Sequence, residues 1–242
     1  MLNLSSTEAE SRELQLRANS LSSLYTIGHS TRTLDELVVA LKAHGVGTLV
    51  DIRAFPMSRR MPHFNRESLE VELPQRGIRY VWMKELGGHR KKIVDESPNT
   101  GLRNDSFRNY ADYMMTEGFE NAVQRLLTIA RETASLSTPA GNDGPPAVGM
   151  TTSDEAEGKG SDDAGMSNLE ETSTAAGLHT AYMCAERMYF QCHRMLVSDY
   201  LTAHGHTVLH IDDEKRAPRP HKLMAEAHLV DGKLQYNAQQ LF

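Results

Sequence analysis

Cysteine is scarce in this 242-residue chain, which contains only Cys184 and Cys192. Two cysteines do not form the disulfide framework of a small secreted protein, and no Cys-x-x-Cys pair is present. A reducing compartment fits this composition best. No apolar run approaches the length needed to span a membrane, and the N-terminus lacks the basic start and apolar run of a signal peptide. We therefore expect a soluble cytoplasmic protein without a membrane partner, with the nucleus left open.

Aromatic and β-branched apolar patterning is almost missing between residues 134 and 178. This segment carries eight acidic residues against one lysine and contains Pro145-Pro146. Such a composition cannot bury enough apolar surface to offset the entropy lost on ordering. We predict a disordered acidic insertion at 134–178, a disordered polar tail at 1–23, and a single domain over 24–242 that the insertion interrupts. Because the acids are concentrated in the insertion, the rest of the chain is mildly basic.

Strand-like and helix-like segments alternate along the rest of the chain, and turn residues separate them. Thr33 and Glu36 form a capping-box pattern before one helix, Asn65 is expected to cap the next, and Asp231-Gly232 is typical of a hairpin. This alternation predicts an α/β fold of Rossmann-like layering, in which a mostly parallel five-stranded sheet has helices on both faces. The expected strands are Leu24 to Ile27, Val46 to Ile52, Ile78 to Trp82, Thr180 to Cys184 and Thr207 to Ile211.

Chemically useful residues follow each of these predicted strands. In an open parallel sheet, ligands bind beyond the carboxyl ends of the strands. We therefore expect one rim to gather Gly28, His29 and Ser30 from the first strand, Asp51 and Arg53 from the second, Glu85 with Gly87-Gly88 from the third, Cys184 and Glu186 from the fourth, and His210 and Asp212 from the fifth.

The tripeptide Gly28-His29-Ser30 offers an unhindered backbone, a titratable ring and a hydroxyl just before a helix, which suits an anion such as phosphate. A simple glycine turn is the alternative. The loop from Arg53 to Arg66 interleaves arginines with Phe55, Phe64 and His63, as expected for phosphate contact and ring stacking. A solvated basic loop explains most of it equally well. Arg53 is the exception, because it directly follows a strand that should be buried.

The stretch from Met183 to Arg194 contains both cysteines, Glu186, His193 and Arg194. Three interpretations compete: a catalytic or anion-binding rim, a thiol redox or nucleophile site, and a metal site made from the cysteines with His193 and His29. The metal site is the weakest because it lacks a strong ligand spacing, and no metal ligand is assigned. Cys192 and His193 fall near the start of a helix, where the dipole favours a thiolate.

Several of these motifs, taken in order, resemble the domain of unknown function 488 family. They are Tyr25 to Ser30, Asp51-Ile52-Arg53 with Pro56 and Ser58, Gly77-Ile78-x-Tyr80 with Leu86-Gly87-Gly88, and Cys184-Ala185-Glu186 with Cys192-His193-Arg194. The resemblance covers roughly residues 24 to 133 and 180 to 212. It implies an α/β core and marks the motif positions, but the family has no settled activity. The long acidic segment departs from the family's usual pattern.

Our leading hypothesis is an enzyme-like rim that binds a phosphate-bearing ligand, either a nucleotide or a nucleic-acid segment, for hydrolysis or group transfer. Glu186, His29, Cys192 and His193 are the catalytic candidates, and Gly28, Ser30, Asp51, Arg53 and Arg194 are the ligand-binding candidates. The alternatives are a non-catalytic nucleic-acid-binding module, for which the acidic insertion would act as an internal mimic, and a thiol redox protein. The sequence names no cofactor and no oligomeric state. Four other histidines show no ligand pattern and are interpreted as surface residues: His204, His206, His221 and His228.

Overall fold

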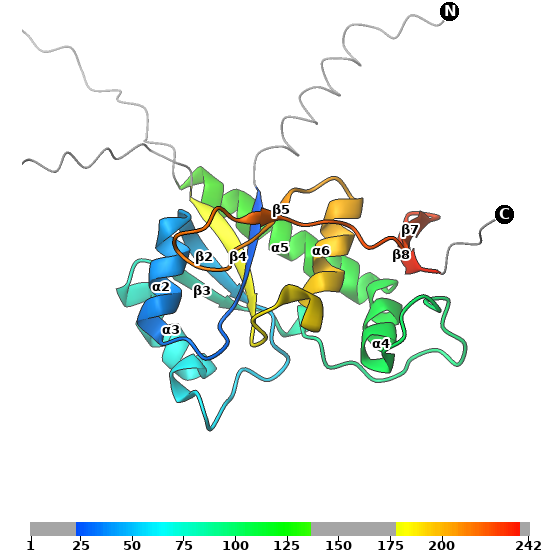
Figure 1. The fold of residues 1–242 in the computed structure, drawn as a ribbon, viewed down its shortest axis with the longest axis horizontal. Coiled ribbons are helices and arrows are strands. Elements are labelled where there is room, and N and C mark those ends of the chain that lie inside the picture. The colour runs from blue at the N-terminus through cyan, green and yellow to red at the C-terminus, as the bar shows by residue number, and fades with distance from the viewer. Residues whose placement is uncertain (1–22, 137–177, 238–242) are drawn as a thin grey trace, which may run out of the picture.

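The computed structural model describes residues 23–136 and 178–237. A six-stranded sheet of order β3-β2-β4-β1-β5-β6 forms its centre (Figure 1). Five strands are parallel, and the two-residue β6 pairs antiparallel with β5. This confirms the predicted mostly parallel sheet, with one short strand more than expected. The strands are β1 (Leu24–Gly28), β2 (Val46–Asp51), β3 (Arg79–Trp82), β4 (His179–Cys184), β5 (Val208–His210) and β6 (Arg219–Pro220).

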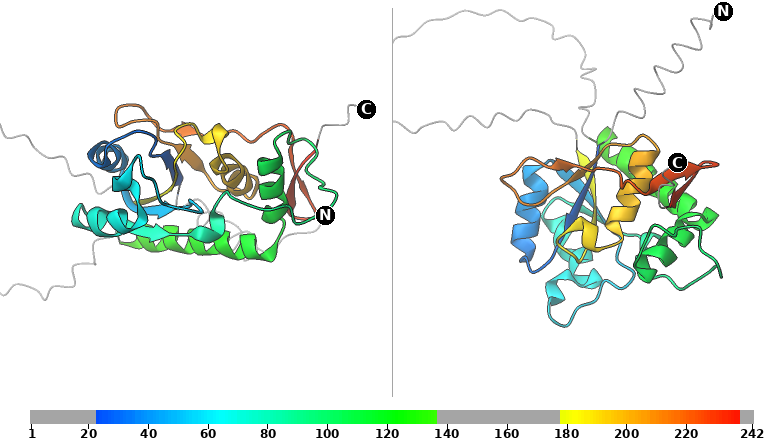
Figure 2. Two further views of the ribbon diagram at one scale, coloured as in Figure 1. Left: turned by 90° about the horizontal axis from the view of Figure 1, so that it is seen from below. Right: turned by 45° about the vertical axis from the view of Figure 1, so that its right-hand side comes forward.

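Helices cover both faces of the sheet, as the α/β pattern predicts. The helices α2 (Leu34–Ala43) and α3 (Arg66–Gln75) pack on one face, whereas α5 (Glu117–Ser135) and α6 (Arg194–Ala203) pack on the other. Two apolar clusters result, one on each side of the sheet, because a parallel strand buries both of its faces. Helix α4 (Asp105–Met114) and the hairpin of β7 (Ala227–Val230) and β8 (Lys233–Tyr236) lie beyond one edge of the sheet (Figures 1 and 2).

The order of the strands creates a switch point between β1 and β4. From β1 the chain passes through α2 to β2, and from β4 it passes through α6 to β5 on the other side of β1. Adjacent parallel strands whose connections leave in opposite directions open a crevice at their carboxyl ends, where ligands bind in folds of this type. Gly28 and Cys184 are paired at this point.

Local sequence signals are confirmed at two positions and fail at a third. Thr33 and Glu36 form both hydrogen bonds of a capping box, and Asp231 and Gly232 have positive φ in the turn between β7 and β8. Asn65 precedes α3, but its side chain does not cap the helix. Its Oδ1 accepts a hydrogen bond from the Ser58 backbone N–H at 2.6 Å instead, so it closes the preceding loop.

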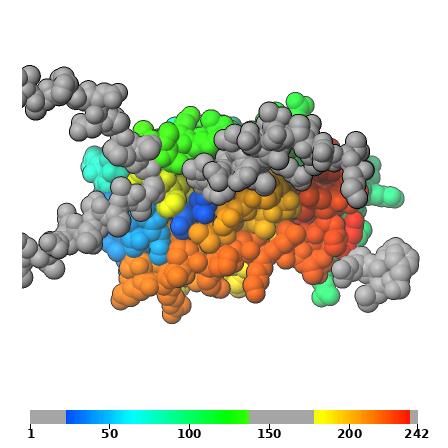
Figure 3. Space-filling view, turned by 90° about the horizontal axis from the view of Figure 1, so that it is seen from above, coloured from blue at the N-terminus to red at the C-terminus, as the bar shows by residue number. Residues whose placement is uncertain are grey.

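The C-terminal segment runs from β5 along one side of the molecule to the hairpin (Figure 3, orange to red). Within the described residues, no helix is long and apolar enough to cross a membrane. The predicted tail at 1–23 lies outside the described residues except for Ser23, and residues 137–177 of the predicted insertion also lie outside them. Helix α5 continues to Ser135, so the first two residues of the predicted insertion are helical.

Candidate functional site

The strand-end residues meet at the switch point. Asp51 of β2 pairs with Met183 of β4, and Gly28 of β1 pairs with Cys184 of the same strand. The loops that leave these strands therefore share one edge, and the start of α6 adds Cys192, His193 and Arg194 to it. We call this set of strand ends and the start of α6 the rim.

Asp51 and Arg53 form a buried ion pair. The carboxylate is fully buried and accepts Arg53 Nε at 2.9 Å, the Arg53 backbone N–H at 3.0 Å and the Tyr80 hydroxyl at 2.8 Å. The same guanidinium donates to the Phe64 carbonyl and to His29 Nε2. Because these groups bind one another, Asp51 and Arg53 hold the rim together and present little free hydrogen-bonding capacity to a ligand.

The Gly28-His29-Ser30 turn is also occupied by protein contacts. The His29 and Ser30 backbone N–H groups donate to the carbonyls of Cys184 and Ala185. These two N–H groups are therefore not available to bind an anion. His29 Nδ1 is 3.0 Å from the Ser30 carbonyl oxygen, which makes Nδ1 the protonated nitrogen and Nε2 the acceptor from Arg53. Burial, with the Arg53 charge second, lowers the pKa of His29 to about 4, so the ring is neutral near pH 7.

Gly28 is required by a close approach. A Cβ at this position would lie 1.9 Å from the Glu186 carbonyl oxygen and 2.8 Å from Arg194 Nη2. The missing side chain therefore lets the loop after β4 and the Arg194 guanidinium pass over the end of β1.

We expect Gly28→Ala to lower the free energy of unfolding by about 1–3 kcal/mol, because overpacking forces the loop and Arg194 to move. Gly118→Ala is a matched control, since a Cβ there would meet its nearest neighbour at an ordinary 3.8 Å. Urea unfolding of both variants measures the difference. Equal stabilities for the two variants would contradict the close-approach account.

Arg194 is a buried cation inside the rim, with 1% of its surface exposed. Its guanidinium donates to Cys192 Sγ at 3.4 Å, to Thr26 Oγ1 at 3.2 Å and to the carbonyls of Glu186 and Arg187. No carboxylate forms an ion pair with it in the part of the chain that the structure describes. A buried charge is stable only when it is paired, so the sulfur of Cys192 is the available counter-charge.

Cys192 has the surroundings of a thiolate. A hydrogen bond from the Cys184 thiol, followed by the charge and N–H groups of Arg194, lowers the pKa of Cys192 to about 6 in spite of burial. The same hydrogen bond, together with burial, raises the pKa of Cys184, which therefore stays protonated. The two sulfurs act as a donor and an acceptor, so they are chemically unequal.

His193 is held in one tautomer at the start of α6. Its Nε2 lies 3.0 Å from the Ile52 carbonyl oxygen, which can only accept, so Nε2 carries the proton and Nδ1 is an acceptor. Burial lowers the pKa of His193 to about 4, which keeps the ring neutral. A Cβ on Gly88 would lie 2.4 Å from Nδ1, so this glycine makes room for the ring.

One donor atom each from Cys184, Cys192 and His193 lies within 4.8 Å of the other two. Two sulfurs and an unprotonated imidazole nitrogen are ligands that a soft divalent metal such as zinc accepts, and a fourth position would stay open. The residues could hold such an ion. A metal site made from these three residues with His29 is the weakest of the three interpretations of the sequence.

Glu186 takes part in the rim through its backbone. Its carbonyl accepts from Arg194, whereas its side chain is exposed. The exposed carboxylate lies at the surface, apart from the buried cysteine and histidine. The sequence made Glu186 a catalytic candidate beside Cys192, and the contacts support Cys192 more strongly.

The rim histidines predict a pH dependence of stability. The folded pKa values of His29 and His193, both about 4, lie below the usual value of 6.5, so protons bind the unfolded chain more tightly. Their contribution to stability is present above pH 6.5 and is lost as the pH falls toward 4, with a slope of up to about 1.4 kcal/mol per pH unit for each histidine. Cys192 also contributes to stability, because its folded pKa of about 6 lies below that of an ordinary thiol. This contribution decreases as the pH falls and is lost completely near pH 6.

Urea unfolding at a series of pH values between 7 and 4 should show this loss, and His193→Gln should reduce its slope. A stability that stays constant between pH 6 and pH 4 would contradict the assignment of neutral, buried histidines.

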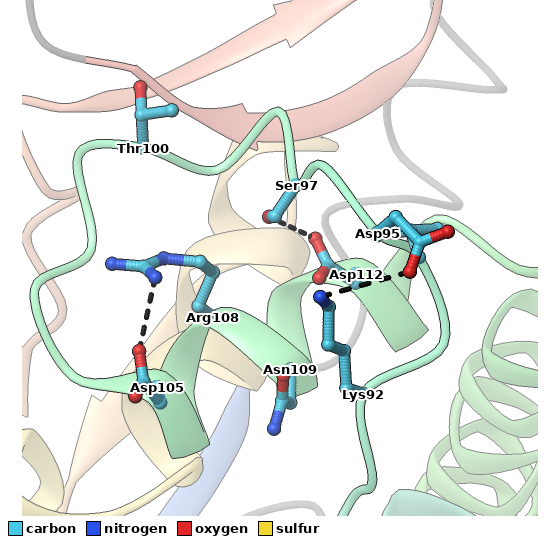
Figure 4. Close-up of a pocket in the computed structure, with 9 residues that line it drawn as sticks. Lys92, Asp95, Ser97, Thr100, Asp105, Arg108, Asn109 and Asp112 are labelled. Carbon is cyan, nitrogen blue, oxygen red and sulfur yellow. Dashed lines mark hydrogen bonds and ion pairs between the residues drawn. The ribbon is translucent and has the colours of Figure 1, made fainter.

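Two of the pockets that the described residues form lie outside this cluster. One of about 680 Å³ is lined by Arg187, Met188, Asp212, Arg216, Ala217 and Arg219. The other, of about 500 Å³, lies between the loop after β3 and α4, where the Ser97 hydroxyl donates to the buried Asp112 carboxylate (Figure 4). None of the predicted site residues lines the second pocket, and Asp212 is the only predicted strand-end residue that lines the first.

Sequence reasoning missed one buried group of polar residues. His221 was interpreted as a surface residue, but it is 8% exposed and lies 2.8 Å from Asp199. The error has a physical reason: Asp199 falls on the inner face of α6, and the link to His221 appears only when the C-terminal segment folds back against that helix. The arginine-lined pocket was missed for the same reason.

Comparison with known proteins supports the family resemblance over part of the chain. No curated protein and no solved structure matches the chain. Residues 33–140 match the model of a family described as Domain of unknown function DUF488, a range that ends before the Cys184 to Arg194 stretch. The match confirms the resemblance expected from the sequence over residues 33–140, which are similar to the DUF488 family.

Proposed function

We propose that the rim is an enzyme-like group-transfer site at which the Cys192 thiolate is the nucleophile and the substrate is a phosphate-bearing ligand. One observation carries this proposal: Arg194 is buried without a carboxylate partner among the described residues and contacts Cys192 Sγ. A thiolate that neutralises a buried guanidinium is present at neutral pH and can attack an electrophilic centre.

Each sulfur has its own part in this chemistry. Cys192 forms the bond to the transferred group as the bond to the leaving group breaks. Cys184 donates its S–H to the Cys192 thiolate, and the neutral His193 Nδ1, 3.9 Å from Cys184 Sγ, is an alternative hydrogen-bond acceptor for the same S–H. The buried surroundings exclude water from the thiolate, which suits transfer of a group.

The exposed arginines of the same edge support the choice of a phosphate-bearing ligand. Arg53 and Arg194 were the expected phosphate ligands, but their N–H groups bind protein atoms. Three exposed arginines, Arg187, Arg216 and Arg219, line an open pocket beside the loop that covers Arg194. Two of them also form ion pairs at the surface, Arg216 with Asp213 and Arg219 with Asp212. Guanidinium groups bind phosphate oxygens in pairs of hydrogen bonds, so this pocket suits a nucleotide or a nucleic-acid segment.

Alkylation by iodoacetamide, followed by mass spectrometry, tests the nucleophile. We expect Cys192 to react with a midpoint near pH 6 and Cys184 to stay unreacted at neutral pH. Cys184→Ser keeps a hydroxyl donor and should retain much of this behaviour, whereas Cys184→Ala removes the donor and should move the Cys192 midpoint upward. Equal midpoints in the two variants, or faster reaction of Cys184 than of Cys192, would rule out the assignment.

A thiol redox function is the second candidate, because the two sulfurs are within 4.8 Å of each other. It requires a Cys184–Cys192 disulfide under mild oxidation, which would form with the loss of two hydrogens to the oxidant. Peptide mapping after treatment with oxidised glutathione detects the bond. If both cysteines stay free under these conditions, this candidate is removed.

A nucleic-acid-binding module is the third candidate, favoured by the exposed loop after β2. Phe55 and Met57 are 68% and 75% exposed, and they lie close in sequence to the exposed Arg59 and Arg60. Aromatic and cationic side chains on one exposed loop suit a single strand. Binding should weaken steeply with salt, and the Arg59→Ala, Arg60→Ala double variant should reduce that slope. Failure of the protein to bind single- or double-stranded nucleic acid at low salt would exclude this function.

A further inference from the structure

A chain of three buried side chains lies behind the rim, between α6 and the C-terminal segment. Asp199 Oδ1 is 2.8 Å from His221 Nε2, and His221 Nδ1 is 2.9 Å from His210 Nε2. All three residues are less than 9% exposed. We call this chain the histidine relay, and it reaches from a helix, across the C-terminal segment, to the end of β5.

Asp199 fixes one end of the histidine relay. Its carboxylate also accepts the Met224 backbone N–H at 3.1 Å and the Tyr236 hydroxyl at 3.1 Å. Every one of these partners donates, so His221 Nε2 carries a proton toward the carboxylate. His221 is also the only partner of Asp199 in an ion pair within the described part of the chain. A buried carboxylate stabilises the imidazolium of a histidine bonded to it.

The other end of the histidine relay is unpartnered. His210 Nδ1 is buried and has no hydrogen-bond partner among the residues that the structure describes. Buried polar atoms are nearly always paired, so this nitrogen is an exception that calls for a ligand or a transferred proton. The Tyr189 ring stacks on His210 with a centroid separation of 3.6 Å and an angle of 8°, which holds the imidazole in place.

Two proton states of the histidine relay differ at this nitrogen. When His221 is neutral, its Nδ1 accepts from His210 Nε2–H, and His210 Nδ1 is an acceptor. When His221 is an imidazolium, it donates to His210 Nε2, and His210 Nδ1 carries a hydrogen. A proton gained or lost at His210 therefore places its charge on His221, beside Asp199. Burial, with the nearby His221, Arg194 and Arg219 following, lowers the pKa of His210 to about 3, so His210 itself does not hold the charge.

The surroundings of His210 are cationic and adjoin the arginine-lined pocket. Arg219 is directly opposite His210 in the β5–β6 pairing and lines the pocket, where it forms an ion pair with Asp212 at 2.8 Å. Met188, another residue of the pocket wall, precedes Tyr189. On the side of α6, His210 experiences the charge of Arg194. The pocket lining carries three arginines against one aspartate, so its net positive charge favours an anionic oxygen as the ligand atom.

We propose that Asp199, His221 and His210 form a proton relay, and that His210 Nδ1 serves as general acid and base for a phosphate-bearing ligand in the adjoining pocket. The class of ligand rests on the function proposed above, whereas the relay rests on its own contacts. Acting as acid, His210 Nδ1 gives its proton to a leaving oxygen as the His221 Nδ1 proton moves to His210 Nε2. His221 then becomes neutral, and the reverse steps restore the imidazolium.

Long-range proton–nitrogen correlation spectra of the full chain with 15N-labelled histidine test the relay. As the pH is lowered, we expect His221 to become an imidazolium and His210 to change from the Nε2–H to the Nδ1–H tautomer in one shared transition. Asp199→Asn should lower the midpoint by at least about one pH unit, a tenfold loss of proton affinity, although residue 199 does not touch His210. Inorganic pyrophosphate should raise the midpoint in the wild type, because the charged state attracts anions.

Tyr236→Phe is the control, since it removes one hydrogen bond to Asp199 and keeps the charge, and the shared transition should persist. Separate transitions for His210 and His221, or a midpoint unchanged in Asp199→Asn, would overturn the relay. A midpoint that pyrophosphate does not move would overturn the proposal that the relay acts on a phosphate-bearing ligand. Cys192→Ser should keep the shared transition, so failure of the relay and failure of the thiolate nucleophile give different results.

Discussion

Arg194→Met is expected to slow the alkylation of Cys192 at neutral pH by about tenfold or more. The substitution removes the positive charge and the N–H groups that stabilise the thiolate, and it leaves only the Cys184 thiol to do so. Burial then dominates and returns the pKa of Cys192 toward that of an ordinary thiol. The quantity to measure is the alkylation rate from peptide mass spectrometry at several pH values.

Arg187→Ala is the control for this experiment. Arg187 contributes its backbone carbonyl to Arg194, and its own side chain is exposed, so the variant should alkylate at nearly the wild-type rate. Near-ultraviolet circular dichroism shows whether Arg194→Met keeps its tertiary packing, which is necessary for the comparison. A folded Arg194→Met variant that alkylates as fast as the wild type would contradict the ion pair.

Asp51→Asn is expected to have the largest effect on stability, a loss of about 3–5 kcal/mol in the free energy of unfolding. The substitution leaves the buried Arg53 guanidinium without a counter-charge. In addition, the new amide NH2 group would face the N–H groups that now donate to the carboxylate, so donor would meet donor. Breaking a buried pair from one side costs more than the pair contributes, because one charge is left unpaired.

Tyr80→Phe is the matched control for Asp51→Asn. It removes one hydrogen bond to the same carboxylate without leaving a charge unpaired, and it should cost about 1 kcal/mol. Urea unfolding gives both values. A loss below about 1 kcal/mol in Asp51→Asn would show that Arg53 finds another partner and that the pair does not organise the rim.

Much of the fold is predictable from local sequence. The capping box of Thr33 and Glu36, the hairpin at Asp231 and Gly232, and the alternation of strands and helices each depend on residues close in the chain. The strand β6 carries no such signal, because its two residues are too few to show a periodic pattern and one of them is a proline. Asn65 shows the limit of a local rule, because a loop residue, Ser58, competes for its side chain.

The location of the candidate site is also predictable, because the carboxyl ends of parallel strands share one edge. The roles of the residues in this site are harder to predict from the sequence. Arg53 and Arg194 have the residue type of phosphate ligands, but their contacts come from segments distant in sequence, such as Phe64 and Thr26. Sequence alone does not reveal that the N–H groups of a guanidinium already have hydrogen-bond partners within the protein. The same is true of His221, whose partner Asp199 lies on a different element.

These contacts distinguish the candidate residues of the Met183 to Arg194 stretch from one another. The cysteines, rather than Glu186, have the buried partners that alter reactivity, and Arg194 provides a charge that Cys192 balances. Gly28 also has a different role from the one expected: it gives space to the loop that contacts Arg194, and its turn does not offer free N–H groups.

The proposed nucleophile requires Cys192 to be a thiolate at neutral pH. Its most direct test is the ultraviolet absorbance of the thiolate over a pH titration, taken as the difference between the wild type and Cys192→Ser so that tyrosine absorbance cancels. We expect a transition near pH 6. A transition at about pH 8.5 or higher, the range of an unperturbed thiol, would contradict it.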